Sequence, residues 1–282
     1  MHTWIHDLGK SLFRRRPVRR LRPRFLLERL DDRCLPSAGF GFLQNNLVSD
    51  LPGVAAVRDS NLVNPWGLTA APGGPWWISD NGTGVSTLYT GNGQMVPIGK
   101  NGFVTVPPPM TTPPTPQSAP TGVVFNGTSD FVVSAGGKSG PALFLFVTED
   151  GTVSGWSPKV DVNNAILEVN NTNQDAGPVF KGATLAQQGS ANFLYVTDFR
   201  DAKIDVFNSQ FAPVNLSSTA FHDPSLPAGF APFNIQNING KLYVTYAKQN
   251  DAKHDDVAGS GNGFVDVFNP DGSPGLAGGK ER

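Results

Sequence analysis

Pro65-Trp-Gly-Leu68 opens the first of four similar units in this chain. The same register recurs as Pro120-Thr-Gly-Val123, Phe180-Lys-Gly-Ala183 and Pro232-Phe-Asn-Ile235, at spacings of 55, 60 and 52 residues. The third position of each unit is therefore Gly67, Gly122, Gly182 or Asn234. Glycine and asparagine best tolerate a positive φ, so the register predicts one shared left-handed backbone conformation at this position.

Each unit continues with aromatic and β-branched segments that favour strands. We expect second strands at Trp76–Asp80, Asp130–Ser134, Phe193–Asp198 and Lys241–Tyr246, and third strands at Ser86–Tyr89, Ala142–Val147, Ile204–Phe207 and Val265–Phe268. Weaker fourth strands are expected at Met95–Ile98, Thr152–Trp156 and Pro213–Leu216. Repeats of about this length are typical of propeller blades. The sequence therefore predicts an all-β protein, a β-propeller of four-stranded blades; the alternative is a β-sandwich with coincidental spacing.

Composition and charge narrow the class of protein. The 282 residues are 39% hydrophobic and include 32 Gly and 24 Pro, which suits one large β domain with many turns. Residues 1–33 hold ten of the 22 Lys and Arg and four of the 23 Asp and Glu, which leaves 12 basic and 19 acidic residues in the body. An acidic body makes nucleic acid an unsuitable partner for it. No apolar run is long enough to span a membrane as a helix.

The N-terminal residues 1–38 are expected to form a basic, disordered leader. The run Arg14–Arg24 is dominated by like charges and prolines, and the single cysteine, Cys34, has no intrachain partner. The stretch Leu26–Ser37 resembles the Leu-Glu-x-Arg…Pro-Ser leader of exported planctomycete proteins. That resemblance implies export to the periplasm, the cell surface or the medium; the alternative is a disordered cytoplasmic tail.

The body resembles a family of exported bacterial propellers that has no settled activity and some of whose members end in a PEP-CTERM tail. The matching segments include Asn61–Leu68, Trp77–Gly84, Glu149–Trp156 and Leu226–Gln236, and Leu194–Phe207 is similar to an NHL repeat. Members of that family continue with a second Pro-Trp-Gly unit. The resemblance therefore implies NHL-like blades, about four present of a probable six, in residues 39–275, with a disordered tail at 276–282. A four-bladed ring is the rival interpretation.

If the chain is a truncated propeller with four blades of six, as the resemblance implies, one N-terminal strand has no partner. Leu43–Val48 precedes the first unit and has no partner within it. Such a strand often completes the last blade of a closed propeller, so we expect it to expose an unpaired edge here.

One mouth of the propeller is the expected ligand site. First strands begin and second strands end on the same side of up-and-down blades, and loops on a rigid scaffold concentrate function. The predicted ligand-binding residues are Asn64, Asp80, Asn81, Lys181, Asp198 and Asn234. Their expected ligand is a small molecule, a glycan or a protein.

A metal site is the second prediction. The stretch Gln249–Asn262 carries Asp251, His254, Asp255 and Asp256, which could hold Ca²⁺ or a transition metal; the alternative is a solvated acidic loop. Lactonase-type propellers hold a central Ca²⁺ with Glu, Asn and Asp. Here the body has few glutamates, and Glu149 and Glu168 are not expected at an inner mouth position.

These patterns leave three functions open. The body contains no Gly-x-Ser-x-Gly motif and no thiol, so we expect a binding or surface protein without a catalytic set. The alternatives are a Ca²⁺-dependent, lactonase-like hydrolase or lyase, and a nonfunctional truncated fragment.

Overall fold

The computed structural model describes residues 44–111, 113–172 and 177–275, and these residues contain only β-structure. All of the described residues except Gln44 belong to one compact unit, Asn45–Arg282. The predicted leader, Cys34 and the predicted tail lie outside the described residues. No helix among the described residues is long and apolar enough to cross a membrane.

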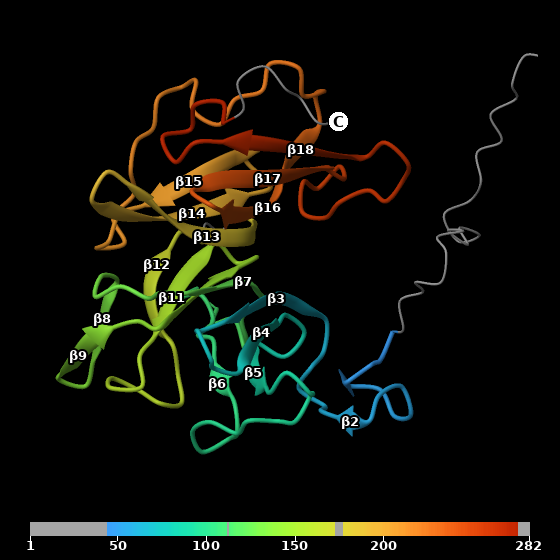
Figure 1. The fold of residues 1–282 in the computed structure, drawn as a ribbon, viewed down its shortest axis with the longest axis vertical. Helices are drawn as coiled ribbons and strands as arrows, with labels where there is room; N and C mark the ends of the chain where they lie inside the picture. Colours follow the sequence, from blue (N-terminus) through green and yellow to red (C-terminus); the bar gives the residue numbers. More distant parts are fainter. Residues whose placement is uncertain (1–43, 112, 173–176, 276–282) are drawn as a thin grey trace, which may run out of the picture. The chain divides into compact units, whose positions relative to one another are not determined.

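Four antiparallel sheets follow one another along the chain and confirm the propeller prediction (Figure 1). Blade 1 contains β3 (Pro65–Ala70), β4 (Trp76–Asp80), β5 (Val85–Tyr89) and β6 (Val104–Thr105). Its fourth strand is therefore not Met95–Ile98, which contributes only an isolated bridge between Met95 and Tyr89. The outermost strand, β6, pairs with β5 at only two positions, and β5 is itself buried along its whole length.

Blade 2 differs most from the sequence prediction. It contains β7 (Pro120–Phe125), β10 (Phe144–Thr148), β11 (Thr152–Trp156) and β12 (Ile166–Asn170), in that spatial order. The expected second strand instead lies in a separate hairpin, β8 (Val132–Ala135) with β9 (Lys138–Pro141). The segments expected as third and fourth strands therefore occupy the second and third positions.

Blades 3 and 4 are three-stranded. Blade 3 contains β13 (Phe180–Gln188), β14 (Ala191–Asp198) and β15 (Lys203–Phe207). Blade 4 contains β16 (Phe230–Ile238), β17 (Lys241–Lys248) and β18 (Gly263–Phe268). The expected fourth strand at Pro213–Leu216 is reduced to a bridge between Phe207 and Pro213.

Successive blades pack face to face and bury three apolar clusters. Trp77 of blade 1 stacks on Phe144 of blade 2 with ring centroids 4.0 Å apart. Leu194 of blade 3 packs with the blade 2 side chains, and Ile235 of blade 4 packs with the blade 3 side chains. The cores therefore lie between blades, so each blade depends on its neighbour for burial of its apolar face.

The repeated glycines have a different reason from the one predicted. Gly67, Gly122 and Gly182 do not have positive φ, and neither does Asn234. A Cβ on Gly67 would lie 2.7 Å from the backbone nitrogen of Val123 in the next blade, and one on Gly122 would lie 2.9 Å from that of Ala183. The third position of the repeat is therefore occupied by glycine because neighbouring backbones approach closely there, whereas Asn234, the larger residue at this position in blade 4, is exposed.

The N-terminal strand also differs from expectation. β1 (Val48–Ser49) pairs in parallel with β2 (Val57–Arg58) in a small sheet of its own. Asp59, which follows β2, accepts a hydrogen bond from the Tyr89 hydroxyl at 2.9 Å, so this segment is attached to blade 1.

Candidate functional site

Each blade sends one side chain from an irregular point near the start of its innermost strand. The pairing registers shift between Pro65 and Leu68, between Phe180 and Gly182, and between Pro232 and Asn234, and β10 shifts against β7 beside Thr121. The residues at these points are Trp66, Thr121, Lys181 and Phe233, each directly before the glycine or asparagine of the repeat. A bulge of this kind turns a side chain away from the regular alternation of the strand.

Lys181 lies at the meeting point of these residues. Its side chain is only 1% exposed. Its Nζ lies 4.9 Å from the ring centroid of Trp66 and 5.9 Å from those of Phe199 and Phe233. The Trp66 and Phe233 rings are themselves 5.6 Å apart, so blades 1 and 4 meet through their side chains here. Aromatic faces attract a cation, which partly compensates the ammonium group for its lost water.

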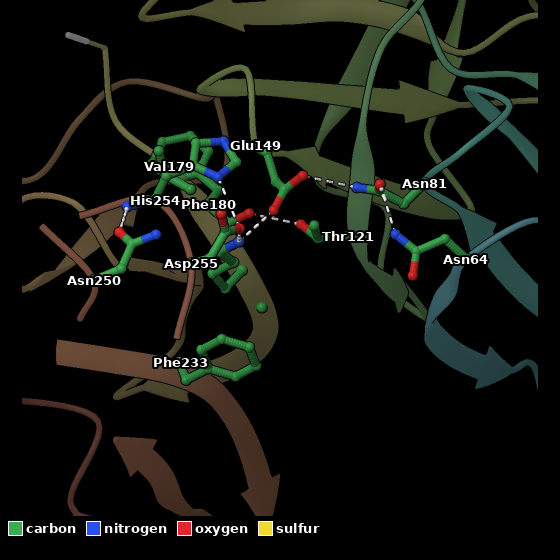
Figure 2. Close-up of polar contacts among 12 residues, drawn as sticks. Asn64, Asn81, Thr121, Glu149, Val179, Phe180, Phe233, Asn250, His254 and Asp255 are labelled. Atoms are coloured by element: carbon green, nitrogen blue, oxygen red, sulfur yellow. Dashed lines mark hydrogen bonds and ion pairs between the residues drawn. The ribbon is translucent and has the colours of Figure 1, made fainter. Parts of the chain in front are cut away.

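A carboxylate from blade 2 completes the environment of Lys181. Glu149, whose side chain is 12% exposed, forms an ion pair with Lys181 through Oε1. Its Oε2 accepts a hydrogen bond from Asn81 Nδ2 at 3.0 Å, and Asn81 Oδ1 accepts one from Asn64 Nδ2 at 3.0 Å. Figure 2 shows Asn64 and Asn81 on one side of Glu149 and His254 and Asp255 on the other. Blades 1, 2 and 3 are thus linked by one polar network.

The β17–β18 loop of blade 4 brings a second carboxylate. Asp255 Oδ1 lies 3.7 Å from Lys181 Nζ and 2.9 Å from His254 Nδ1. The hydrogen bond with His254 lowers the pKa of Asp255 against a smaller opposing effect of burial, and the nearby charge of Lys181 lowers it slightly further. Asn250 holds the loop in place: its Oδ1 accepts from the His254 backbone N–H, and its own N–H donates to the Asp255 carbonyl. We call Asn64, Asn81, Glu149, Lys181, His254 and Asp255 the mouth cluster.

The sequence prediction places Glu149 away from the mouth, and this is wrong. Because β10 is the second strand of blade 2, Glu149 follows Thr148 as Asn81 follows Asp80 in blade 1. The backbone confirms the equivalence: Glu149 N–H donates to the Ala119 carbonyl, and Asn81 N–H to the Asn64 carbonyl. The β8–β9 insertion hid this register. The Asp150-Gly151 turn directly follows Glu149 and was the sequence signal that a strand ends at this residue.

The other predicted ligand-binding residues lie elsewhere. Asp80 and Asp198 are fully buried within blades 1 and 3, where their carboxylates accept the Thr87 and Val179 backbone N–H groups. Asn234 is exposed on blade 4, where its Oδ1 accepts the Ile235 N–H. Of the four predicted metal ligands, His254 and Asp255 belong to the cluster, whereas Asp251 and Asp256 are exposed and outside it.

Asp80 and Asp198 have strongly perturbed acidity. Burial raises the pKa of Asp80 to about 8, against hydrogen bonds from Thr87, and the charge of Asp59 raises it further. Burial likewise raises the pKa of Asp198 to about 7, opposed by the Asp201 backbone N–H. Asp80 Oδ1 has no hydrogen-bond partner among the described residues. These carboxyl groups are therefore structural acids inside the blades.

The mouth cluster includes three groups that could hold a metal ion. One ligand atom each from Glu149, His254 and Asp255 lies within 4.8 Å of the others. Ca²⁺ requires six to eight oxygen ligands, and a histidine nitrogen is not among those it prefers, so the set does not fit Ca²⁺. Mixed imidazole and carboxylate ligands suit a transition metal better. The Lys181 ammonium already pairs with both carboxylates, however, and a metal would have to compete with it for them.

Comparison with known proteins adds relatives but no activity. No protein-family model matches the chain. An uncharacterised protein of Acanthamoeba polyphaga mimivirus is 33% identical over 232 residues, which cover 81% of this chain and 55% of that protein. A second mimivirus protein is 29% identical over 232 residues, covering 81% and 59%. The chain thus spans little more than half the length of these relatives.

Solved structures show weak similarity. Virginiamycin B lyase from Staphylococcus aureus matches with a TM-score of 0.40 and 12% identity, over 73% of this chain and 55% of that one. Hydrazine synthase of Kuenenia stuttgartiensis matches with a TM-score of 0.43 and 17% identity, over 81% and 49%. The fold assignment accordingly rests on the sheets of this chain, and the activities of those enzymes are not transferred to it.

Proposed function

We propose that this protein is a propeller-type binding protein whose ligand contacts the mouth cluster. The observation that carries the proposal is convergence: side chains from four separate blades meet around the buried Lys181–Glu149 pair. Convergent polar groups on a rigid scaffold are typical of binding sites. The amine of the cluster, Lys181, is enclosed by two carboxylates and three aromatic rings and its side chain is only 1% exposed, so binding at the rim is favoured over covalent catalysis.

The charges of the cluster favour a neutral, hydroxyl-rich ligand. Lys181 already has two carboxylate partners, which leaves no unpaired positive charge for an anion. At the mouth, the Asn64 amide and the Asp255 carboxylate are exposed to solvent, and Asn81 and His254 are half-buried. Amide, imidazole and carboxylate groups donate to and accept from hydroxyls, so a mono- or oligosaccharide is the ligand class that we propose.

Calorimetric titration with a panel of soluble mono- and oligosaccharides tests this proposal. We expect saturable binding of at least one sugar, weakened by roughly fivefold in Asn64→Ala, because one hydrogen bond to a ligand contributes on the order of 1 kcal/mol. Asn101→Ala, at an exposed asparagine in the β5–β6 connection, is the matched control. Absence of binding across the panel, or equal affinity in Asn64→Ala and wild type, would contradict the proposal.

A metal-dependent hydrolase or lyase is the second candidate, favoured only by the proximity of Glu149, His254 and Asp255. Metal analysis of the purified protein, with thermal shifts in Zn²⁺ and Ca²⁺, separates the two. Stoichiometric metal that is lost in His254→Ala would favour this candidate. A protein without metal and without a thermal shift would count against it.

We also propose export, on the basis of the leader-like segment Leu26–Ser37. Cell fractionation of the full chain with an added C-terminal tag tests it. Recovery of the tagged protein only in the cytoplasmic fraction would refute export without affecting the proposed binding.

A further inference from the structure

Blades 1 and 3 begin their fourth strands in the same way. After β5, the Val96 N–H donates to the Leu88 carbonyl at 2.8 Å, and after β15 the Val214 N–H donates to the Val206 carbonyl at 2.8 Å. Leu88 of blade 1 and Val206 of blade 3 are therefore equivalent positions. The outer edges of the two third strands can be compared residue by residue from this point.

In blade 1 the chain returns and completes the fourth strand. Val104 of β6 pairs with Ser86 of β5, and the Val106 N–H donates to the Gly84 carbonyl at 3.1 Å. Alternate residues of an antiparallel strand direct their backbone groups to the same neighbour. Gly84, Ser86 and Leu88 thus form the edge that the fourth strand of blade 1 covers.

In blade 3 the same edge stays open. The equivalents of Gly84 and Ser86 are Ala202 and Ile204, and Ala202 has a φ of 54° where Gly84 has one of 71°. Among the described residues, no backbone hydrogen bond from a fourth strand reaches Ala202 or Ile204. The chain continues to blade 4 instead, where the Phe221 N–H donates to the Gly272 carbonyl at 2.8 Å.

A cavity of about 820 Å³ lies beside this open edge. All residues of 201–207 line one side of it, and residues 213–218 line another, so the cavity follows the strand. Its volume is within the usual range of ligand pockets. Asn170, at the end of β12, also lines the cavity, and its buried Oδ1 has no hydrogen-bond partner among the described residues. We call the part of the cavity beside Ala202 and Ile204 the blade 3 slot.

The blade 3 slot has an excess of negative charge. Lys203 Nζ lies 3.2 Å from Asp205 Oδ1, 3.5 Å from Asp201 Oδ2 and 3.8 Å from Asp198 Oδ2. Burial raises the pKa of Asp198 to about 7, so this carboxyl group is partly protonated near neutral pH. Two ionised carboxylates still face one ammonium group, which favours a partner with a basic side chain. No residue of the mouth cluster lines this cavity.

We propose that the blade 3 slot binds an extended segment of another polypeptide as the fourth strand of the blade. The register of β6 in blade 1 sets the expected contacts. An apolar side chain would lie opposite Ile204, as the fully buried Val104 lies opposite Ser86. The preceding residue of the segment would lie opposite Asp205 and carry the basic side chain. Strand addition of this kind takes its affinity from backbone hydrogen bonds and its specificity from side chains.

A synthetic peptide tests the proposal directly. The probe is a fluorescein-labelled peptide with the sequence of Gly102–Val106 and the change Phe103→Arg, and its binding to the full chain is followed by fluorescence anisotropy. We expect saturable binding, and binding weakened by more than about tenfold in the Phe103→Glu peptide, because a like charge then faces Asp205.

Two N-methylated peptides separate strand addition from other contacts. N-methylation at Val106 removes the donor expected to reach the Ala202 carbonyl, and should weaken binding by about tenfold. N-methylation at Thr105 is the matched control, because in blade 1 this N–H donates to the Asn163 carbonyl, away from β5. Equal affinities of the two N-methylated peptides would overturn the proposal.

Amide hydrogen exchange measured by NMR locates the bound peptide. We expect the exchange of the Ile204 N–H to slow when the peptide binds, because this group faces the fourth-strand position. No saturable binding of the Phe103→Arg peptide, or binding without protection of Ile204, would overturn the proposal. Protection of Ile204 by soluble saccharides but not by the peptide would also overturn it and assign the cavity to a small molecule.

Discussion

Gly67→Ala tests whether the repeated glycines exist for close approach of the blades. The new Cβ would lie 2.7 Å from the Val123 backbone nitrogen, closer still to the Thr121 carbonyl oxygen, and 3.0 Å from Val123 Cγ1. Two of these atoms belong to backbone, so blade 2 must shift as a unit. Overpacking of this kind costs about 1–3 kcal/mol or more, while the lower entropy of the unfolded alanine chain returns only about 0.4–1 kcal/mol. We therefore expect a net loss of about 2 kcal/mol.

The matched control is Gly91→Ala. Gly91 also lacks a positive φ, and a Cβ there meets only Trp76 Nε1 at 4.0 Å, so this variant should show the entropic gain alone and be more stable by about 0.4–1 kcal/mol. Urea denaturation followed by tryptophan fluorescence measures both variants. A second comparison uses Gly182→Ala, whose Cβ would meet the Asn234 side chain first and Asn234 Cα at 3.0 Å. Asn234→Gly should recover part of that loss. Equal stability of the Gly67→Ala and Gly91→Ala variants would refute the close-approach explanation.

Three further predictions follow from buried polar groups. Burial raises the pKa of Asp80 to about 8, so the native state binds a proton more tightly than the unfolded state. The free energy of unfolding should therefore fall as pH rises from about 4 to 8, by up to about 1.4 kcal/mol per pH unit. Asp80→Asn should flatten this slope in urea titrations at pH 5.5 and 7.5, and an unchanged slope would contradict this prediction. Lys181→Met leaves Glu149 unpaired and should cost about 3–5 kcal/mol, with substantial recovery when Glu149→Gln is added; a double-mutant cycle without coupling would exclude the buried pair. Thr197→Val should cost about 1–3 kcal/mol and Thr245→Val clearly less, because only Thr197 bonds to another blade; equal losses would argue against the inter-blade hydrogen bond.

Strands were predicted correctly where their positions depended only on the local sequence. Blades 1, 3 and 4 have second and third strands close to the expected segments, because those segments are rich in the aromatic and β-branched residues that strands favour. Blade 2 was misassigned because β8, which overlaps the expected second strand, also carries strand-forming valines. Propensity does not distinguish a hairpin that stands beside a blade from a strand within it.

The candidate site was predicted in part for the same reason. Asn64, Asn81 and Lys181 lie together at the mouth with His254 and Asp255, as strand ends and loops of neighbouring blades must. Glu149 was missed because its position depended on the register of blade 2. Asp80 and Asp198 occupy strand ends, but their side chains turn into the blades, where Thr87 and the Val179 backbone N–H bind them.

The amino-acid sequence by itself determined that this chain forms successive β-blades. The repeated register, Pro or Phe followed two residues later by Gly or Asn, and the apolar strands carry that information locally, within about 55 residues at a time. Only the tertiary structure decided why the glycines recur and which polar groups meet. The recurrence of glycine and the meeting of the polar groups both depend on distances between blades. Neighbouring backbones lie too close together to admit a Cβ, and Lys181 of one blade pairs with Glu149 of another. A contact between two segments far apart in the chain cannot be recognised from the sequence of either segment alone, because neither sequence identifies its partner.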